Sequence, residues 1–330
     1  MPMPDWARAH GAPLFSATIR TQPQDFRVEE DLPFEFSGDG EHDYLHVEKT
    51  GANTEWVSRQ LARFAGVPAR DVGYAGLKDR HAVTRQWFSV PRWHAPDWNV
   101  FVAEGVRLLE VRRHNRKLRR GAHRGNAFHI VLRGDAIEKH HEAVAQRISV
   151  IRERGVPNYF GDQRFGRDGA NVGLADDWAA GKRMPRHLRS LAISTARSLM
   201  FNERLEQRVQ AGDWDRVLPG DVVNLDGSNS IFTADVVDAD LEARCRALDL
   251  HPAGVLWGDG APGAAEGHEA WVAALARARV EVGWRALRLR VTALEAAPSE
   301  DAIEIRFSLP SGAFATGVLR EIAEVRDRAE

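Results

Sequence analysis

The sequence predicts an α+β fold, in which short strands and helices mix without the regular alternation that builds a doubly wound parallel sheet. The first observation is a set of short apolar, β-branched or aromatic runs, which are typical of strands. These runs lie at residues 26–29, 44–49, 87–90, 106–111 and 128–132. The second observation is that helical periodicity appears only in separate stretches between or after them. These stretches lie at residues 54–65, 136–154 and 190–210.

The first helix has a clear start and end. Asn53 or Thr54 can cap its N-terminus, and Gly66 follows its last turn. Three apolar residues share one face at helical spacing: Val57, Leu61 and Phe64. We therefore expect this helix to pack its apolar face against the strands around it.

A strand and a short helix are predicted near the end of the chain. From Ala302 the residues alternate, with three large apolar side chains directed inward: Ile303, Ile305 and Phe307. The segment LPSG then turns the chain, and a helix is expected near Ala315. With 330 residues, the chain exceeds the usual size of one hydrophobic core, so we expect two domains or one domain with a large insertion.

The composition excludes several classes of protein. Hydrophobic residues make up 43% and charged residues 28% of the chain, and no apolar run is long enough to span a bilayer. The N-terminal segment lacks the pattern of a secretion signal, so we expect a cytoplasmic protein without membrane contact. The single cysteine, Cys245, and the absence of spaced histidine pairs indicate no metal site.

Positive charge gathers in one place, although the formal net charge is −2. Seven cations and no acid occur in thirteen residues, namely Arg112, Arg113, Arg116, Lys117, Arg119, Arg120 and Arg124. Such a run is either a solvated loop or a surface that follows a phosphate backbone.

A glycine pattern resembling a dinucleotide-binding motif occurs late in the chain, at Gly258, Gly260 and Gly263. No second strand–helix–strand unit accompanies it, and Pro262 suits a surface loop. We therefore expect no nucleotide cofactor.

The segment GYAGLKDRHAVTRQWFSV, residues 73–90, places Asp79 between Lys78 and Arg80. Neighbouring cations favour the ionised form of a carboxyl group. A positioned carboxylate can act as a nucleophile or stabilise positive charge at a sugar C1′. From charge alone, a solvated ion-pair cluster is the more common explanation of such a triplet.

The run GYAGLKDRHAVTRQ closely resembles the signature around the catalytic aspartate of the TruD family of tRNA pseudouridine synthases, with Asp79 at the position of the nucleophile. Four other segments resemble successive motifs of that family: DFRVEEDLPFEFSGDGEH, RRHNRKLRRGAHRGNAF, VPNYFGDQRFGRDGANV and EIRFSLPSGAFATGVLRE. The resemblance implies a pseudouridine-synthase-like core with a mixed, largely antiparallel sheet. It also implies a discontinuous catalytic domain at residues 1–155 and 300–330, with an inserted family-specific α+β domain at residues 156–299.

The resemblance further implies that the chain isomerises uridine to pseudouridine in RNA, at uridine 13 of tRNA, without a cofactor. Asp79 would be the catalytic residue. Six residues are expected to bind the substrate: Phe26, Lys78, Arg80, Asn126, Phe128 and Phe314. Phe26 or Phe128 would pack against the base, Asn126 would hydrogen-bond to the nucleotide, and Phe314 would close the site. The seven cations of the basic run would then hold the RNA backbone.

Several alternatives stay open at this stage. Asp79 can form an adduct at C1′ or remove the 2′ proton, and either Glu29 or Glu30 can assist. A glycosidic-bond hydrolase would use Asp79 with a second carboxylate. A noncatalytic RNA-binding module would keep the basic run and the aromatic residues and make Asp79 incidental.

Overall fold

The computed structural model describes residues 4–135, 137–263, 265–299 and 301–328, and its contacts divide the chain into two compact units. Unit 1 takes the described residues of three segments: Met1–Pro13, Ser149–Val291 and Ala313–Ile322. Unit 2 takes those of Leu14–Ile148, Thr292–Gly312 and Ala323–Glu330. The chain therefore passes between the two units more often than the prediction, which placed boundaries only at residues 155 and 300. The assignment of residues 156–299 as the inserted domain stays a prediction.

Unit 2 is built on a ten-stranded sheet. Its strands are β1 (Ser16–Ile19), β2 (Phe26–Asp31), β3 (His42–Thr50), β4 (Gly73–Tyr74), β5 (Val83–Pro91), β6 (Val106–His114), β7 (Gly125–Arg133), β14 (Thr292–Ser299), β15 (Ala302–Pro310) and β16 (Glu324–Asp327). Seven strands follow the order β14-β15-β7-β2-β5-β3-β6, while β1 pairs with β7 and β16, and β4 pairs with β5. Among the described strands, β2–β5 and β1–β16 pair in parallel and the other pairs are antiparallel. The predicted mixed, largely antiparallel sheet is confirmed.

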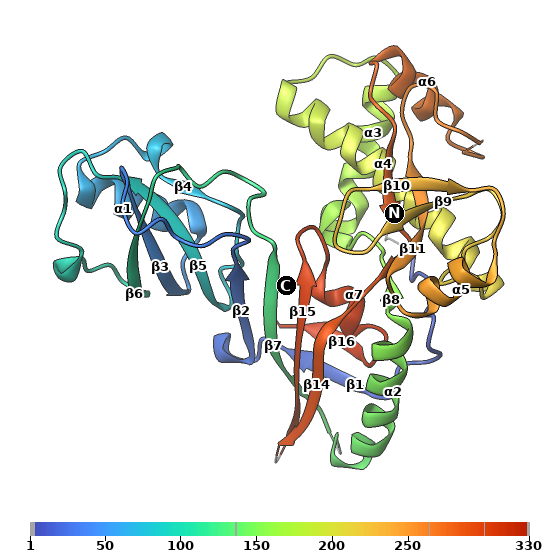
Figure 1. The fold of residues 1–330 in the computed structure, drawn as a ribbon, viewed down its shortest axis with the longest axis horizontal. Helices are drawn as coiled ribbons and strands as arrows, with labels where there is room; N and C mark the ends of the chain where they lie inside the picture. Colours follow the sequence, from blue (N-terminus) through green and yellow to red (C-terminus); the bar gives the residue numbers. More distant parts are fainter. Residues whose placement is uncertain (1–3, 136, 264, 300, 329–330) are drawn as a thin grey trace. The chain divides into compact units, whose positions relative to one another are not determined.

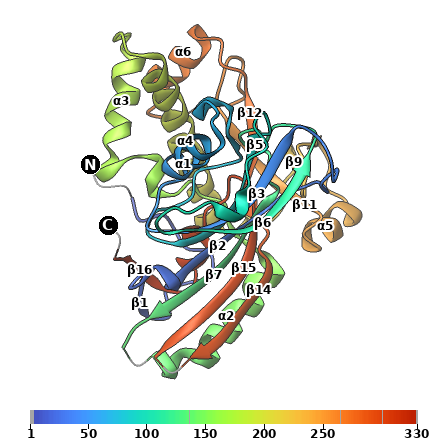
Figure 2. The same cartoon turned by 90° about the vertical axis from the view of Figure 1, so that its left-hand side faces the viewer.

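The sheet joins segments that are far apart in the sequence. Figure 1 and Figure 2 show β7, coloured green, beside β15 and β14, coloured red. In this register Phe128 of β7 lies opposite both Val28 of β2 and Phe307 of β15. The alternation predicted for the final strand is confirmed, because its inward side chains are at most 2% exposed: Ile303, Ile305 and Phe307. The short helix α7 (Ala315–Leu319) follows, as predicted.

Helix α1 (Thr54–Ala65) covers one face of the sheet at β3 and β5. Asn53 is its N-cap residue, and Gly66 ends it with a left-handed φ of 66°. Because a residue with a Cβ rarely adopts that conformation, glycine suits this position. The predicted boundaries of this helix are confirmed, and its apolar face packs on Leu45, Val47 and Phe88.

Unit 1 contains most of the remaining elements. They are β8 (Val156–Pro157), α3 (Ala170–Ala179), α4 (Arg186–Ala211), β9 (Asp221–Leu225), β10 (Ile231–Ala234), α5 (Ala239–Arg246), β11 (Leu250–Leu256), α6 (Glu269–Arg277), β12 (Gly283–Ala286), β13 (Arg288–Leu289) and α7. A four-stranded sheet has the order β10-β9-β11-β12. Its partner layer is helical, and the shared core includes Phe201, Trp214 and Leu275.

Two helix predictions are corrected in their boundaries. The helix expected over residues 136–154 is α2 (His141–Arg154), preceded by a 3-10 turn at Ile137–His140; Ala136 lies outside the described residues. The helix expected over residues 190–210 begins earlier, at Arg186, because Pro185 precedes its first turn. Its predicted C-terminal cap, Gly212, is confirmed with a φ of 75°.

The glycine pattern at Gly258, Gly260 and Gly263 lies in a loop between β11 and α6. Strand β11 pairs with β9 and β12, and both pairs are antiparallel. A dinucleotide motif instead follows a parallel strand and opens directly into a helix. This geometry favours the surface-loop interpretation of the pattern. Among the described helices, none combines the length and apolar character needed to cross a lipid bilayer.

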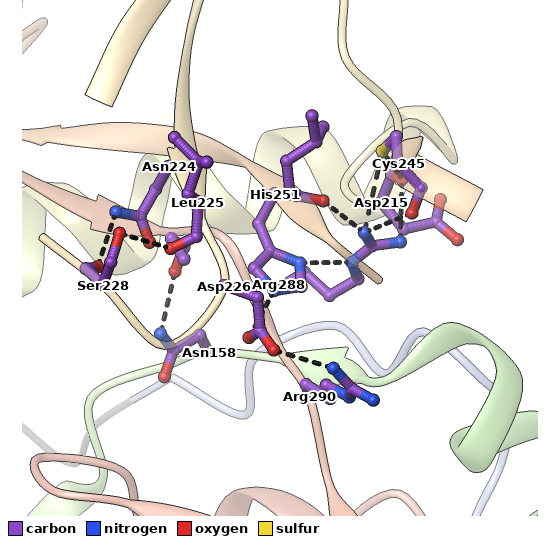
Figure 3. A network of polar contacts seen from close by, with 12 residues as sticks. Asn158, Asp215, Asn224, Leu225, Asp226, Ser228, Cys245, His251, Arg288 and Arg290 are labelled. Atoms are coloured by element: carbon purple, nitrogen blue, oxygen red, sulfur yellow. Dashed lines mark hydrogen bonds and ion pairs between the residues drawn. The ribbon is translucent and has the colours of Figure 1, made fainter. Parts of the chain in front are cut away.

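A buried polar network ties the strands of unit 1 together (Figure 3). Arg288 is 3% exposed, and its Nε donates to Nδ1 of His251 at 2.9 Å. Its Nη2 donates to the carbonyl oxygens of Cys245 at 2.6 Å and Leu250 at 2.8 Å. On the other side of the ring, His251 Nε2 lies 2.9 Å from Oδ1 of Asp226. Since Nδ1 accepts a hydrogen bond, His251 is held in its neutral form with the proton on Nε2.

Acidification is expected to weaken this network through His251. Burial is the main cause that lowers the pKa of His251 below its ordinary 6.5. The unfolded chain therefore binds the proton more tightly than the folded protein. The contribution of neutral His251 to the free energy of unfolding is fully present above pH 6.5 and decreases as the pH drops toward the lowered pKa. Urea-unfolding midpoints at about pH 7.5 and about pH 5.5 should differ less in His251→Gln, whose amide cannot take up a proton, than in the wild type.

The substitution itself is expected to cost about 1–3 kcal/mol at neutral pH, because a buried polar network loses its best geometry. His187→Gln is the matched control, since His187 is exposed on α4. An equal pH dependence in His251→Gln and His187→Gln would contradict the assignment.

Candidate active site

Asp79 lies in unit 2, in the loop between β4 and β5, and both of its carboxylate oxygens are engaged. Oδ1 accepts a hydrogen bond from the backbone N–H of His81 at 2.8 Å. Oδ2 lies 2.9 Å from Nη2 of Arg20, and the Asp79 side chain is 35% exposed. The carboxylate is therefore positioned from two sides and still accessible to a ligand.

Arg20 is the cation that pairs with Asp79, and sequence reasoning missed it. Its side chain is 6% exposed and also pairs with Asp327 of β16. The guanidinium carbon lies 3.9 Å from the ring centroid of Phe26, so the cation rests on an aromatic face. Arg20 has a φ of 55°, a strained conformation for a residue with a side chain. No local pattern marks this residue, because its partners come from distant segments.

The cations next to Asp79 in the sequence have other partners in the described structure. Nζ of Lys78 lies 2.9 Å from Oε1 of Glu30, and these side chains are 6% and 0% exposed. Nε of Arg80 donates to the carbonyl oxygen of Gly51 at 3.0 Å. The sequence-based expectation that Lys78 and Arg80 are the cations beside the Asp79 carboxylate is therefore corrected, because the cation that pairs with Asp79 is Arg20. Their role in substrate binding stays a prediction.

The backbone of the Asp79 loop is held by a buried lysine. Lys49 of β3 is fully buried, and its Nζ donates to the carbonyl oxygens of Asp79 at 2.7 Å and Lys78 at 3.3 Å. Oγ1 of Thr54, at the start of α1, accepts the backbone N–H of Lys78 at 2.9 Å. Burial lowers the pKa of Lys49 to about 8. Sequence reasoning missed Lys49 as well, since a lysine on an alternating strand is usually exposed.

An aromatic surface lies on the same face of the sheet as these residues. The rings of Phe26 and Phe128 meet edge to face at a centroid distance of 6.3 Å. Phe128 also stacks on Phe307 at 5.2 Å. Strand register places Glu30 opposite Asn126 on this face, whereas Glu29 points to the other face and pairs with Arg85. Phe26 and Phe128, predicted separately, are thus brought into contact.

Asn126 carries an unmet hydrogen-bonding group. Its Oδ1 is buried and has no hydrogen-bond partner among the described residues. A buried acceptor without a donor costs about 1–3 kcal/mol. The predicted role of Asn126 in hydrogen bonding to the nucleotide stays a prediction.

Phe314 belongs to unit 1, unlike the other predicted site residues. It is the N-cap residue of α7, and its ring lies 6.5 Å from that of Phe160. These contacts are those of a packed aromatic residue. Its predicted role in closing the site stays a prediction.

The seven cations of the basic run lie at the end of β6 and in the loop that leads to β7. Five of them are engaged by neighbours: Arg112 by Glu110, Arg113 by the carbonyl of Gly40, Lys117 by the carbonyl of Arg70, Arg120 by the ring of Tyr74 and Arg124 by Asp31. The remaining two, Arg116 and Arg119, are exposed. In the ranges that the structure describes, no three His, Cys, Asp or Glu side chains gather as metal ligands would.

Taken together, the site offers an accessible carboxylate held by a buried arginine, an aromatic surface and a free amide oxygen. A carboxylate of this kind suits attack on an electrophilic carbon, and a flat apolar surface suits a planar ring.

Comparisons with known proteins bear on the family and the fold of this chain. A family model described as tRNA pseudouridine synthase D (TruD) matches residues 9–175 and 173–322. A protein named tRNA pseudouridine synthase D from Methylococcus capsulatus is 48% identical over 336 residues, covering 97% of this chain and 94% of that protein. One of the same name from Nitrosococcus oceani is 44% identical over 333 residues, covering 96% and 92%. A crystal structure of a candidate TruD from Methanosarcina mazei shares the fold, with a TM-score of 0.77 at 19% identity, covering 97% of this chain and 96% of that chain.

Replacement of Lys49 is expected to change the stability in a pH-dependent way. Because the folded pKa is about 8 and the ordinary value 10.5, the unfolded chain binds more protons between these values. The wild type should therefore gain stability relative to Lys49→Met as the pH rises through this window. At neutral pH the free energy of unfolding of the variant is expected to be about 1–3 kcal/mol lower than that of the wild type, because two buried carbonyls lose their donor.

The measurement is the difference in urea-unfolding midpoint between wild type and variant at about pH 7.5 and about pH 9.5. Lys139→Met serves as the control, since Lys139 is exposed. A difference that is the same at both pH values for Lys49→Met would show that Lys49 is not a perturbed buried cation.

Proposed function

The chain belongs to the tRNA pseudouridine synthase D family, and we propose that it isomerises uridine 13 of tRNA with Asp79 as the catalytic residue. As a member it is a tRNA pseudouridine synthase, an isomerase that converts uridine to pseudouridine. The position of the target uridine and the role of Asp79 are the proposed part. The observation that carries the proposal is the Arg20–Asp79 pair beside the contacting rings of Phe26 and Phe128.

The reaction exchanges one bond of the uracil for another. The N1–C1′ bond breaks, the uracil turns while bound, and C5 forms a new bond to C1′. The proton on C5 is lost and N1 ends with a proton, so no atom is gained or lost overall. Asp79 starts the reaction by adding to C1′ or by removing the 2′ proton, and both routes need its ionised form.

Arg20 supports the proposal by fixing the position of Asp79. Its Nη2 lies 2.9 Å from Oδ2 of Asp79. The second partner of Arg20, Asp327, and the ring of Phe26 restrict the guanidinium to one place. Asp79 is therefore presented in one orientation, which lowers the cost of aligning it with the substrate.

The aromatic residues support binding of an extruded base. Reaching C1′ requires the uridine to leave its stack, and aromatic rings replace part of the lost stacking. Phe128 is half-buried and is suited to contact the base. Phe26 is buried below Arg20 and supports the ring of Phe128. The free Oδ1 of Asn126 can accept an N–H of uracil. Phe314 is proposed to close the site when RNA binds, and Lys78 and Arg80 to contact the nucleotide.

Unit 2, which carries Asp79, corresponds to most of the proposed catalytic domain, and unit 1 to the family-specific insertion with short additional segments. Of the two glutamates left open by the sequence, Glu30 is the better candidate to assist, because it pairs with Lys78 on the face of Phe26. We propose that the enzyme works in the cytoplasm on tRNA and needs no metal or nucleotide cofactor.

Asp79→Asn is expected to reduce pseudouridine formation by at least about a thousand-fold, because the amide is neither a nucleophile nor a base. The Kd for tRNA should stay within about three-fold of the wild type, since the backbone contacts remain. Single-turnover assays with an unmodified transcript and filter binding measure the two quantities. Asp249→Asn, in an exposed pair with Arg244, is the matched control.

Full activity of Asp79→Asn would exclude the proposed role of Asp79. In a noncatalytic RNA-binding module Asp79 is incidental, so Asp79→Asn would keep the full function of the wild type.

The product and position are tested on the same transcript without added cofactor. We expect a product of unchanged mass with pseudouridine at position 13, and no product from a transcript that carries cytidine there. Free uracil would favour the hydrolase, because it shows that water reaches the intermediate. Conversion at another uridine would contradict the proposed target while leaving the isomerase activity intact.

A further inference from the structure

A second pocket in unit 2 is separate from the Asp79 carboxylate. Its volume is about 770 Å³, within the range of small-molecule sites. Two kinds of side chain line it, aromatic and cationic: Phe34, Tyr44 and His114, and Arg116, Lys117 and Arg119.

The aromatic side of the pocket is rigidly assembled. Phe34 stacks on His114 with a centroid distance of 4.9 Å and an interplanar angle of 15°. Tyr44 stands nearly perpendicular to both, at 6.0 Å from Phe34 and 5.2 Å from His114. Its hydroxyl donates to the carbonyl oxygen of Arg116 at 3.0 Å, so the aromatic wall also fixes the basic loop. Such a wall offers flat apolar surface to a planar ring.

His114 adds a hydrogen-bond donor to this wall. Its Nδ1 accepts the backbone N–H of Ser37 at 3.3 Å, which leaves the proton of the neutral ring on Nε2. Burial lowers the pKa of His114, in agreement with a neutral ring. Among the described residues, none pairs with Nε2 of His114, which remains a donor for a ligand.

The cationic side of the pocket consists of three exposed members of the basic run. Within the described ranges, Arg116, Lys117 and Arg119 pair with no carboxylate, and Nζ of Lys117 donates to the carbonyl of Arg70 at 2.7 Å. The other four members of the run lie outside the pocket lining. Unbalanced cations at the edge of an apolar wall favour a ligand that has a phosphate next to a flat ring.

The pocket is connected to the segment that leads to Asp79. The N–H of Gly121 donates to the carbonyl of Ala75 at 2.8 Å, and that of Leu118 to Ser89 Oγ at 2.9 Å. A Cβ on Gly73 would lie 2.3 Å from the carbonyl oxygen of Leu118, so the loop and β4 are in close backbone contact. The basic loop that lines the pocket is thus packed directly against the segment that leads to Asp79.

We propose that this pocket binds a second unstacked nucleotide of the tRNA, near the target in the chain. Its base packs against Phe34 and His114, and its phosphate lies among Arg116, Lys117 and Arg119. Because every base has a flat aromatic face and an acceptor for the Nε2–H of His114, the pocket accepts any base and reads its presence, not its identity. This inference rests on the proposed function, since it takes tRNA as the substrate.

The test couples a protein variant to an RNA change. Transcripts are prepared in which one nucleotide at a time, on either side of the target, lacks its base but keeps its phosphate. The affinity of each transcript is measured by filter binding for the wild type, Phe34→Leu and Arg119→Gln. Phe34→Leu keeps an apolar side chain at the wall and removes the aromatic face, and circular dichroism verifies its fold.

At one flanking position we expect base removal to weaken wild-type binding about ten-fold, the typical effect of losing one stacked base. Phe34→Leu should lose about ten-fold on the intact transcript and nothing more on that abasic transcript. Arg119→Gln should weaken binding to both transcripts equally and reduce the salt dependence by about one unit. Lys139→Gln, which removes an exposed charge outside the pocket, should leave that slope unchanged.

The proposal is overturned if the loss of affinity from Phe34→Leu and the loss from base removal multiply at every flanking position. It is also overturned if Arg119→Gln and Lys139→Gln bind RNA with the same salt dependence. Because the readout is binding, it also works in Asp79→Asn. Failure of the pocket therefore leaves pseudouridine formation by the wild type unchanged, whereas failure of the proposed function removes that product and leaves the binding coupling measurable.

Discussion

The placement of one carboxylate depends on the ion pair between Arg20 and Asp79. Arg20 is nearly buried, in a strained backbone conformation, and held from three directions by Asp79, Asp327 and the ring of Phe26. A buried cation needs such compensation, because leaving it unpaired costs several kcal/mol. The same contacts that make the arginine tolerable in the interior fix the position of Asp79. The burial of Arg20 and the position of Asp79 thus have one physical origin.

A second constraint acts on the backbone of the Asp79 loop. Lys49 and Thr54 bind main-chain atoms of this loop, and Lys78 is drawn into a buried pair with Glu30. The loop is therefore anchored to β3, α1 and β2 on its inner side. Its outer side stays free for the carboxylate and a ligand. This division explains why a loop of small and charged residues holds one conformation.

The sequence predicted those parts that depend on local pattern. Helix α1 followed from its apolar spacing and Gly66, and β15 from the alternation at Ile303, Ile305 and Phe307. Asp79, Phe26, Phe128 and Asn126 followed from motif resemblance, and strand register gathers the last three on one face. Arg20 and Lys49 were missed because their significance comes from partners up to about three hundred residues away. Sequence adjacency was misleading for Lys78 and Arg80, since neighbours in a turn point in different directions.

Asp327, the partner of Arg20, lies on β16, which pairs in parallel with β1 at the opposite end of the sequence. During synthesis, the ribosome must translate Asp327 before Arg20 can form its second ion pair. A nascent chain can fold α1 and the strands of its first half much earlier, yet it cannot assemble this charge arrangement. Under the proposed function, Asp79 therefore gains its final orientation only late in translation, once β16 has been made.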